Sequence, residues 1–293
     1  MGTFVSVYFR ILKSTASSFN ADSSIQHVVM SVVKLLNSMI TSENPSDTLD
    51  DPLARFTLVL ASIIHDVDHP GVPNAQLIAE NAPVAVAYEG RSVAEQNSLT
   101  IAWGLLMRKE HEALRRTIYQ TEADLERFRE YLVHAVLLTD IVNKDLQTRR
   151  KERWNQVFGD GTDQSPPISS VDEAGRNVRK TALLELVIQA SDVSHTMQHW
   201  HIFRQWNQNL FLESYKAYQG GRAGGKNPAE GWFESEIGFF KFYVIPLAER
   251  VKQSRACGHL GEELYQYACN NVQEWEKKQK EIIRDIQAVI PQD

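Results

Sequence analysis

Apolar residues recur every three or four positions along most of this chain, which is the period of an α-helix buried on one face. The segment 28–39 shows the pattern clearly, with apolar side chains at 28, 29, 32, 35, 36 and 39. The same period predicts further helices over 53–64, 99–106, 125–139, 183–191 and 272–289. The alternating pattern of a half-buried strand is nearly absent, so the sequence predicts an all-α fold.

Two segments rich in glycine and proline, 159–167 and 220–228, interrupt the helical pattern and predict surface loops rather than domain linkers. From Gly220 to Lys226 the second reads Gly-x-x-x-x-Gly-Lys, the spacing of a phosphate-binding loop. However, Asn227 stands where that motif needs Ser or Thr, and the preceding residues predict a helix instead of a strand. We therefore expect no nucleoside triphosphate site in this loop.

Composition agrees with one large helical domain, because 293 residues with 43% hydrophobic content can bury a sizeable core. The net charge of −6 argues against a nucleic-acid polymer as partner, since binding its backbone requires clustered cations. The two cysteines have no paired metal spacing, and no secretion signal is present, which favours reduced thiols in the cytoplasm. The apolar patches of residues 1–12 are interrupted by Arg10 and are too short for a transmembrane segment.

Candidate chemistry is concentrated in the run HDVDHPG at 65–71, which follows the apolar residues 58–64. His65 and His69 stand four apart and would share one helix face, whereas Pro70 cannot continue the helix. We therefore expect the run at a helix end that opens on a cavity. Imidazole nitrogen and carboxylate oxygen together suit zinc, with carboxylate left to bridge to magnesium or manganese. The alternative is a solvated acidic helix end with two surface histidines.

A second carboxylate, Asp192, interrupts the apolar face of the helix predicted over 183–191. Burial without a partner would disfavour its charged form, so a cation or several hydrogen bonds should meet Asp192. Glu95 and Thr139 also place polar groups on apolar helices. Each of these two, taken alone, is more typical of a helix cap or of a satisfied core polar group.

Six motifs follow one another in the order HDVDHPG, SVAEQNSL, LLTD, QASDVSH, FRQWNQNLF and EIGFFKFYVIPL. Together they resemble the catalytic domain of the class I 3′,5′-cyclic-nucleotide phosphodiesterases, over about 26–275. The resemblance implies a compact bundle of many helices, like that of the HD-domain phosphohydrolases, with a metal site at the bottom of a deep pocket. It implies a catalytic domain over 26–290, preceded by an atypical or truncated segment 1–25.

This resemblance also implies an activity and a setting. The chain would hydrolyse cyclic GMP, cyclic AMP or both to 5′-monophosphates in signal transduction. Its partner would be a cyclic mononucleotide, and an upstream regulatory domain or a homodimer would fit the family. We expect it in the cytoplasm, or on the cytoplasmic side of a membrane if an upstream domain holds it there.

The metal site is assigned by the same resemblance. His65, Asp66 and Asp192 would hold the tighter metal, usually zinc, and Asp66 would bridge to a second ion, usually magnesium, with manganese as the alternative. The positions that would orient water and phosphate are His69, Glu95 and Thr139. In two-metal chemistry, both cations acidify the attacking water and take up charge on the phosphate oxygens.

For the nucleotide base, the resemblance implies a pocket between Leu210 and Phe239, with Trp206 as part of its wall. The family usually places glutamine where this chain has Glu236. A carboxylate only accepts hydrogen bonds, whereas guanine offers two donors on its Watson–Crick edge and adenine one. An ionised Glu236 aimed at the base therefore predicts a preference for cyclic GMP. The alternative is that Glu236 is a solvated helix residue.

One family segment is missing from this sequence. The His-Asn-x-x-His run supplies a proton donor and a metal ligand, and an ungapped alignment places these on Asn20 and Ser24. Asparagine has no proton to give, and a serine hydroxyl is a poor zinc ligand. General-acid assistance is worth ~10²–10⁴ in rate, so the change predicts a slow enzyme rather than a dead one. His27 could fill the gap only if 20–26 looped out, yet the pattern over 28–39 favours an undisturbed helix through His27.

Two further functions stay open at this point. The first is a pseudo-enzyme that binds a cyclic nucleotide without turnover. The second is a helical interaction module whose metal site is only structural. A chain that is a fragment, or that has a misread gene boundary, would explain Asn20 and Ser24 without loss of activity in the native protein.

Overall fold

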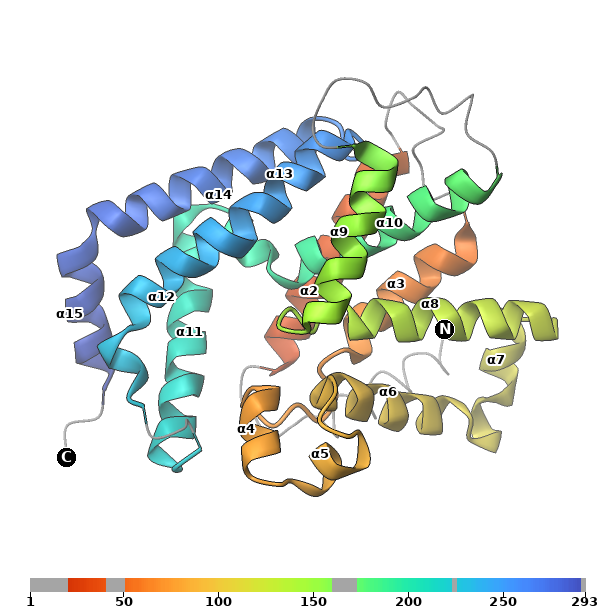
Figure 1. Ribbon diagram of the computed structural model, residues 1–293, viewed down its shortest axis with the longest axis horizontal. Helices are drawn as coiled ribbons and strands as arrows, with labels where there is room; N and C mark the ends of the chain where they lie inside the picture. The colour runs from red at the N-terminus through yellow and green to blue at the C-terminus, as the bar shows by residue number, and fades with distance from the viewer. Residues whose placement is uncertain (1–20, 41–50, 160–172, 223–225, 291–293) are drawn as a thin grey trace.

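The computed structural model describes residues 21–40, 51–159, 173–222 and 226–290, and within these ranges the protein is helical without any strand (Figure 1). The first half contains α2 (Ala21–Ile40), α3 (Pro52–Ile64), α4 (Asn74–Ala79), α5 (Pro83–Ala87), α6 (Val93–Leu106), η2 (Lys109–His111), α7 (Glu112–Ile118), α8 (Glu122–Leu137) and α9 (Lys144–Phe158). The second half contains α10 (Glu173–Asp192), η4 (Ser194–Met197), α11 (Trp200–Gln219), η5 (Pro228–Glu230), α12 (Trp232–Phe239), η6 (Phe240–Val244), α13 (Ile245–Ser254), α14 (His259–Lys277) and α15 (Gln279–Val289). The predicted all-α fold is confirmed.

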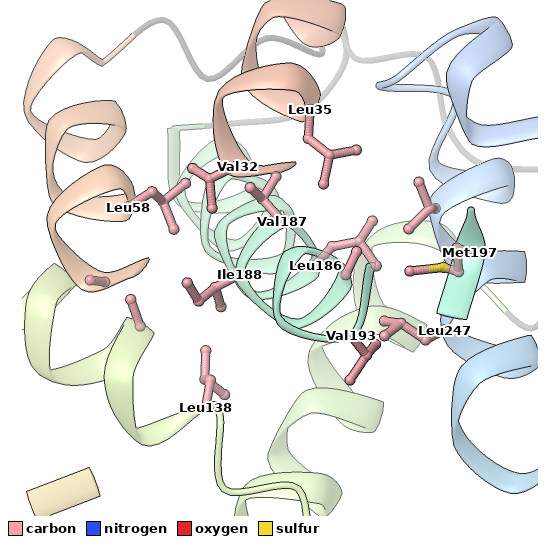
Figure 2. Close-up of a cluster of buried hydrophobic side chains, with 14 of the residues drawn as sticks. Val32, Leu35, Leu58, Leu138, Leu186, Val187, Ile188, Val193, Met197 and Leu247 are labelled. Carbon is pink, nitrogen blue, oxygen red and sulfur yellow. The ribbon is translucent and has the colours of Figure 1, made fainter. Parts of the chain in front are cut away.

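Helix α10 lies at the centre of the molecule, with α3 to α8 on one side of it and α11 to α15 on the other (Figure 1). Its residues from Ala182 to Ser191 are all buried. Figure 2 shows Leu186, Val187 and Ile188 of α10 surrounded by apolar side chains from α2, α3, α13 and the turn after α8. The end of α10, and with it Asp192, is therefore held from several sides at once.

Several helix starts follow directly from the sequence. Asp51 caps α3, because its carboxylate accepts the backbone N–H groups of Leu53 and Ala54 at 3.0 and 3.4 Å, and Pro52 occupies the first turn. Asn143 caps α9 in the same way. Both caps fix where helices around the site begin.

A π-helical turn, η6, joins α12 to α13. Pro246 follows it and has no N–H to donate to the carbonyl group four residues before, at Phe242. Single π turns of this kind are often found at functional sites. Here the turn carries Tyr243, whose ring stacks on that of Phe239 with 5.4 Å between centroids.

The predicted helix 272–289 is wrong as one element, because the chain breaks at Lys278 and forms the end of α14 and then α15. The helix predicted over 125–139 ends at Leu137, so Thr139 lies in the following turn. The helix expected before Gly220 is confirmed as α11, although 223–225 of the loop, like most of 159–167, lies outside the described residues. None of the helices in the described ranges is long and apolar enough to span a membrane.

Candidate active site

The run 65–71 lies at the end of α3, as predicted, but its two histidines do not share a helix face. Helix α3 stops at Ile64, and Asp68 has a φ of +60° in the turn that follows. This turn separates the two imidazoles, so that His65 is buried and His69 is exposed. Nδ1 of His69 accepts a hydrogen bond from the backbone N–H of Gly71, with 3.2 Å between the two nitrogens. The expectation that His65 and His69 share one helix face is therefore wrong.

His65 joins the ends of α3 and α10. Its Nε2 lies 3.2 Å from Oδ1 of Asp192 and 3.5 Å from Oδ2 of Asp66. Its Nδ1 lies 3.1 Å from the carbonyl oxygen of Ser62, which places the ring proton of the neutral form on Nδ1. Burial opposes protonation, but the fields of Asp66 and Asp192 outweigh it and raise the pKa of His65 to about 10. The three residues therefore concentrate negative charge around one imidazole nitrogen.

This donor set suits a cation. A lone pair on Nε2 that faces two carboxylates is favourable only if a proton or a metal ion lies between them, and a hydrogen bond from Nδ1 to a carbonyl group is the usual support of a metal-binding histidine. Within the described residues, however, no three His, Cys, Asp or Glu side chains surround a common point closely enough to form a metal site. The pairwise contacts of His65 are thus the structural basis for the predicted metal set.

Helix α6 packs against the 65–71 turn and carries Glu95. Ser98 donates to the carbonyl oxygen of Val67 at 2.8 Å, and Asn97 donates to Asp68 at 3.1 Å. Burial raises the pKa of Glu95, while a hydrogen bond from Asn74 lowers it. The fields of Asp140 and His69 also act on Glu95. Glu95 and His69 therefore lie in one neighbourhood.

Asn74 was not identified from the sequence, yet it organises the start of α6. Its Oδ1 accepts the backbone N–H of Ala94 and its Nδ2 donates to Glu95, both at 2.9 Å. It thereby replaces the capping bond that Ser92 does not make. A cap that comes from another helix leaves no local sequence signal.

Thr139 occupies the turn after α8, where its hydroxyl donates to the carbonyl oxygen of Val136 at 2.7 Å. The next residue, Asp140, is buried and joins two helices. Its carboxylate accepts a hydrogen bond from the Ser92 hydroxyl at 2.7 Å. It also accepts hydrogen bonds from the backbone N–H groups of Val142 and Asn143 at 3.1 and 3.2 Å. Asp140 is thus a satisfied core carboxylate that positions Thr139 next to the start of α6.

The predicted base pocket draws on α11 and α12. Leu210 is 49% exposed on α11, and Phe239 is half-buried at the end of α12. The Trp206 ring lies 6.2 Å from that of His195, three residues after Asp192. The ring of Tyr243 stacks on that of Phe239. Burial, together with the negative charge of Asp192, raises the pKa of Tyr243 to about 12. Trp206 and Tyr243 therefore connect the predicted base residues with the end of α10.

Glu236 is buried, so its interpretation as a solvated helix residue is wrong. Burial raises its pKa to about 7, although a hydrogen bond with Asn207 and the field of Arg204 act in the opposite direction. The assumption of a fully ionised carboxylate therefore does not hold near neutral pH. Asn207 was missed in the sequence, where it is one polar residue within an aromatic helix.

His27 does not move toward the gap left by the missing histidines. It lies within an uninterrupted α2, with Nε2 3.0 Å from Nε2 of Gln198 and its ring 5.2 Å from that of Trp206. With His199 it lines a cavity of about 440 Å³ between α2, η4 and α14. Asn20 lies outside the described residues, as does the side chain of Ser24.

Comparison with known proteins gives a consistent result. The sequence model of a family described as 3′5′-cyclic nucleotide phosphodiesterase matches residues 24–258. A probable 3′,5′-cyclic-AMP phosphodiesterase of Caenorhabditis elegans is 26% identical over 242 residues, which are 76% of this chain and 32% of that protein. The human cGMP-inhibited 3′,5′-cyclic phosphodiesterase 3A is 29% identical over 166 residues, 56% of this chain and 13% of that protein. The chain therefore spans less than a third of the length of these relatives.

A solved structure has the same fold. The crystal structure of the phosphodiesterase domain of the Salpingoeca rosetta rhodopsin phosphodiesterase superposes with a TM-score of 0.67 and 18% identity, over 98% of this chain and 89% of that domain.

Proposed function

Because this chain belongs to the 3′5′-cyclic nucleotide phosphodiesterase family, we propose that it hydrolyses cyclic GMP, cyclic AMP or both to 5′-monophosphates. The observation that carries the proposal is the contact of His65 with Asp66 and Asp192, which joins the two most distinctive motifs of the sequence at one point. These motifs are more than a hundred residues apart along the chain. Two carboxylates beside a buried imidazole cost desolvation free energy, which apolar side chains would avoid, so fold stability alone does not explain this arrangement.

The family is metal-dependent, and we assign the metal ligands to His65, Asp66 and Asp192. His65 offers a nitrogen, Asp192 a half-buried oxygen and Asp66 an exposed one. A nitrogen together with carboxylate oxygens would suit zinc, and the exposed carboxylate of Asp66 would also suit magnesium or manganese. Bound metal would acidify water and stabilise the charge that develops on the phosphate.

The chain's own groups would position the reactants. Burial raises the pKa of Glu95, which favours this carboxyl as the group that exchanges a proton with a water molecule. His69 is exposed and can donate to a phosphate oxygen, and the Thr139 hydroxyl is held in place by its hydrogen bond to the carbonyl oxygen of Val136. No histidine of the family's missing segment donates a proton to the leaving 3′-oxygen, so this step limits the rate.

We place the base between Leu210 and Phe239, beside Trp206. An ionised Glu236 would then favour cyclic GMP, because it offers only acceptors to the two donors of guanine. We assign the catalytic domain to residues 26–290 and expect it in the cytoplasm. The larger of two buried apolar clusters contains residues from Val32 to Ile286, which supports a single domain over this range.

A hydrolysis assay tests the proposal. Purified chain is incubated with cyclic GMP or cyclic AMP in the presence of magnesium or manganese, beside the double variant Asn20→His, Ser24→His. We expect slow formation of 5′-monophosphate by the chain and an increase of ~10²–10⁴ in the double variant, which restores the acid. Absence of turnover in both proteins contradicts the proposed activity.

Nucleotide binding without turnover is the second candidate function. It is favoured by one observation: His27, the nearest histidine in sequence to the missing pair, is engaged by Gln198 and Trp206 instead. In that case only the double variant hydrolyses the nucleotide. A purely structural metal site would show bound zinc without nucleotide affinity.

A further inference from the structure

The segment 72–93, between the run 65–71 and the helix that carries Glu95, has an apolar cluster of its own. Its buried residues, which are distinct from the main core, are Val72, Leu77, Ala85 and Val93. Helix α4 lies in this segment and begins at Asn74, whose side-chain amide binds both Ala94 and Glu95 of α6. The position of Glu95 therefore depends on how α4 is held.

Helix α11 holds this segment from the side of the predicted base residues. Ala217 packs against the small apolar cluster. Gly71, just before the segment, leaves room for Glu213, because a Cβ atom on Gly71 would lie only 3.0 Å from Oε1 of Glu213. After α11, Gly221 has a φ of +74°, and the backbone N–H of Arg222 donates to the carbonyl oxygen of Ala217 at 2.9 Å. This capping turn fixes the backbone at Arg222.

Arg222 and Glu80 form a bidentate ion pair between α11 and the end of α4. Nε of Arg222 donates to one carboxylate oxygen of Glu80 at 2.9 Å, and Nη2 donates to the other at 2.8 Å. Gln76 adds a third hydrogen bond to the same carboxylate, at 2.9 Å. These hydrogen bonds, first those of the guanidinium and then that of the amide, lower the pKa of Glu80 to about 2.

The geometry of this ion pair matters more than its charge. A single exposed ion pair contributes little to stability, but a bidentate one fixes the orientation of both side chains. Helix α4 is only six residues long and ends against Glu80, so its far end cannot move independently of Asn74 at its start. The contact thus connects α11 with the residue that binds Glu95.

We propose that Arg222 is a positioning residue for the hydrolysis proposed above. It holds α4 through Glu80, and α4 in turn presents Asn74 to Glu95. The inference rests on the proposed function, in which Glu95 exchanges a proton with water. Arg222 lies outside the six motifs of the sequence and 142 residues from Glu80, so no local pattern indicates this role.

Amide hydrogen exchange tests the inference without turnover. The backbone N–H of Ala94 donates to Oδ1 of Asn74, so its exchange rate reports how firmly Asn74 is held. Exchange is followed by NMR on the full chain and on Arg222→Met, which keeps an apolar stem but removes the donors. We expect exchange at Ala94 to become about two- to tenfold faster, the factor that corresponds to the net contribution of one hydrogen bond. The amide of Leu186, buried in the middle of α10, should be unaffected.

Two further variants separate this link from a general loss of surface charge. Arg116→Met removes a comparable ion pair, that of Arg116 with Glu112 at 2.6 Å on α7, and should leave exchange at Ala94 unchanged. In the double variant Glu80→Arg, Arg222→Glu the two charges change places, so the ion pair re-forms and exchange at Ala94 should return toward the original rate. Glu80→Arg alone places two cations together and should exchange at least as fast as Arg222→Met.

Hydrolysis of cyclic nucleotides by the same proteins gives a second readout. Arg222→Met should lower kcat by about tenfold, since misplacement of a reacting group by about 1 Å can cost ~10²-fold. If Arg222 acts through Glu95, the same substitution has no further effect on kcat in the Glu95→Gln background. An Arg222 that only supports the fold would lower kcat by the same factor in both backgrounds.

Equal exchange at Ala94 in Arg222→Met and in the unmodified chain overturns the inference, and so does an equal loss of kcat in both backgrounds. Faster exchange in a chain that hydrolyses no cyclic nucleotide supports the link from Arg222 to Asn74 and contradicts the proposed hydrolysis. Turnover together with unchanged exchange has the opposite meaning.

Discussion

At the scale of single residues, burial of Glu236 predicts that the stability of the fold depends on pH even without a ligand. Its pKa rises from the usual 4.5 to about 7 on folding, because burial disfavours the charge. Protonation of Glu236 stabilises the folded state of the unmodified chain, and this contribution is fully present below pH 4.5 and is lost as the pH rises through 7. The free energy of unfolding of Glu236→Gln, relative to the unmodified chain, should therefore increase by about 3 kcal/mol between pH 4.5 and pH 8.

Urea denaturation of both proteins at several pH values measures this difference. The increase should lie mainly between pH 4.5 and 7. A difference that stays constant from pH 4.5 to pH 8 would show that Glu236 does not change its protonation on folding.

The contact between Asp192 and His65 leads to a prediction about metal affinity. Asp192→Asn removes one of the two carboxylates that contact His65, so zinc affinity should fall by more than the ~10–100-fold that follows loss of an outer partner. Calorimetric titration with zinc measures the change. Asp68→Asn is the matched control, because Asp68 is a carboxylate in the turn that carries Asp66 but accepts a hydrogen bond from Asn97. Equal zinc affinity in both variants would exclude Asp192 as a ligand.

The residue scale also shows where a sequence is ambiguous. The helical repeat makes His65 and His69 equivalent, whereas the structure buries one and exposes the other. The difference arises from the end of α3 at Ile64 and the left-handed conformation of Asp68, neither of which the apolar period specifies. Glu236 was identified from the sequence, but its protonation depends on Arg204 and Asn207 of another helix.

At the scale of helices, a buried carboxylate ties α10 to its neighbours. Glu185 on α10 contacts Nε2 of His134 on α8 at 2.9 Å and forms an ion pair with Arg153 on α9. Burial and the field of Arg153 lower the pKa of His134 to about 4, so His134 is neutral and Arg153 carries the compensating charge. This network joins α8 and α9 to α10, about two helical turns before Asp192.

Arg153→Met should therefore lower the free energy of unfolding by on the order of 3 kcal/mol at pH 7, because it leaves Glu185 buried and charged without a cation. In the double variant Arg153→Met, Glu185→Gln most of this loss should be recovered. Chemical denaturation of the two variants and the unmodified chain measures both effects. If the double variant is as unstable as the single one, the loss comes from packing rather than from an uncompensated charge.

Helix boundaries illustrate what a local pattern contains. The starts of α3 and α9 could be predicted, since Asp51 and Asn143 are local caps. The break at Lys278 could not, because the apolar period continues across it while the chain turns to pack α15 beside α11 and α12. The start of α6 depends on Asn74 from another helix.

At the scale of the whole molecule, metal binding should stabilise the fold. The predicted ligands join the ends of α3 and α10, which are far apart in sequence and are not joined in the unfolded chain. A ligand present at a hundredfold excess over its Kd adds about 2.7 kcal/mol, which corresponds to a rise in Tm of several degrees for a chain of this size. Thermal unfolding with and without zinc measures it. The rise should be absent in Asp192→Asn, and an equal rise in that variant would locate the ion elsewhere.

The fold class followed from helical periodicity alone, and the candidate site followed from the order of six motifs. What the sequence could not reveal are the connections between distant elements. Tyr243 joins Phe239 to the region of Asp192 through a π turn, and Trp232 fixes Asn207 across two helices. Such contacts exist only once α10, α11 and α12 are packed together.

The most direct test of the central claim is the rate of 5′-monophosphate formation from cyclic GMP and cyclic AMP as manganese is added to the metal-free chain. We predict a slow, saturable rate that disappears with a chelator and that requires a higher manganese concentration in Asp192→Asn. A rate that needs no metal, or that is the same in Asp192→Asn at every manganese concentration, would contradict the assignment of His65, Asp66 and Asp192 as the catalytic metal site.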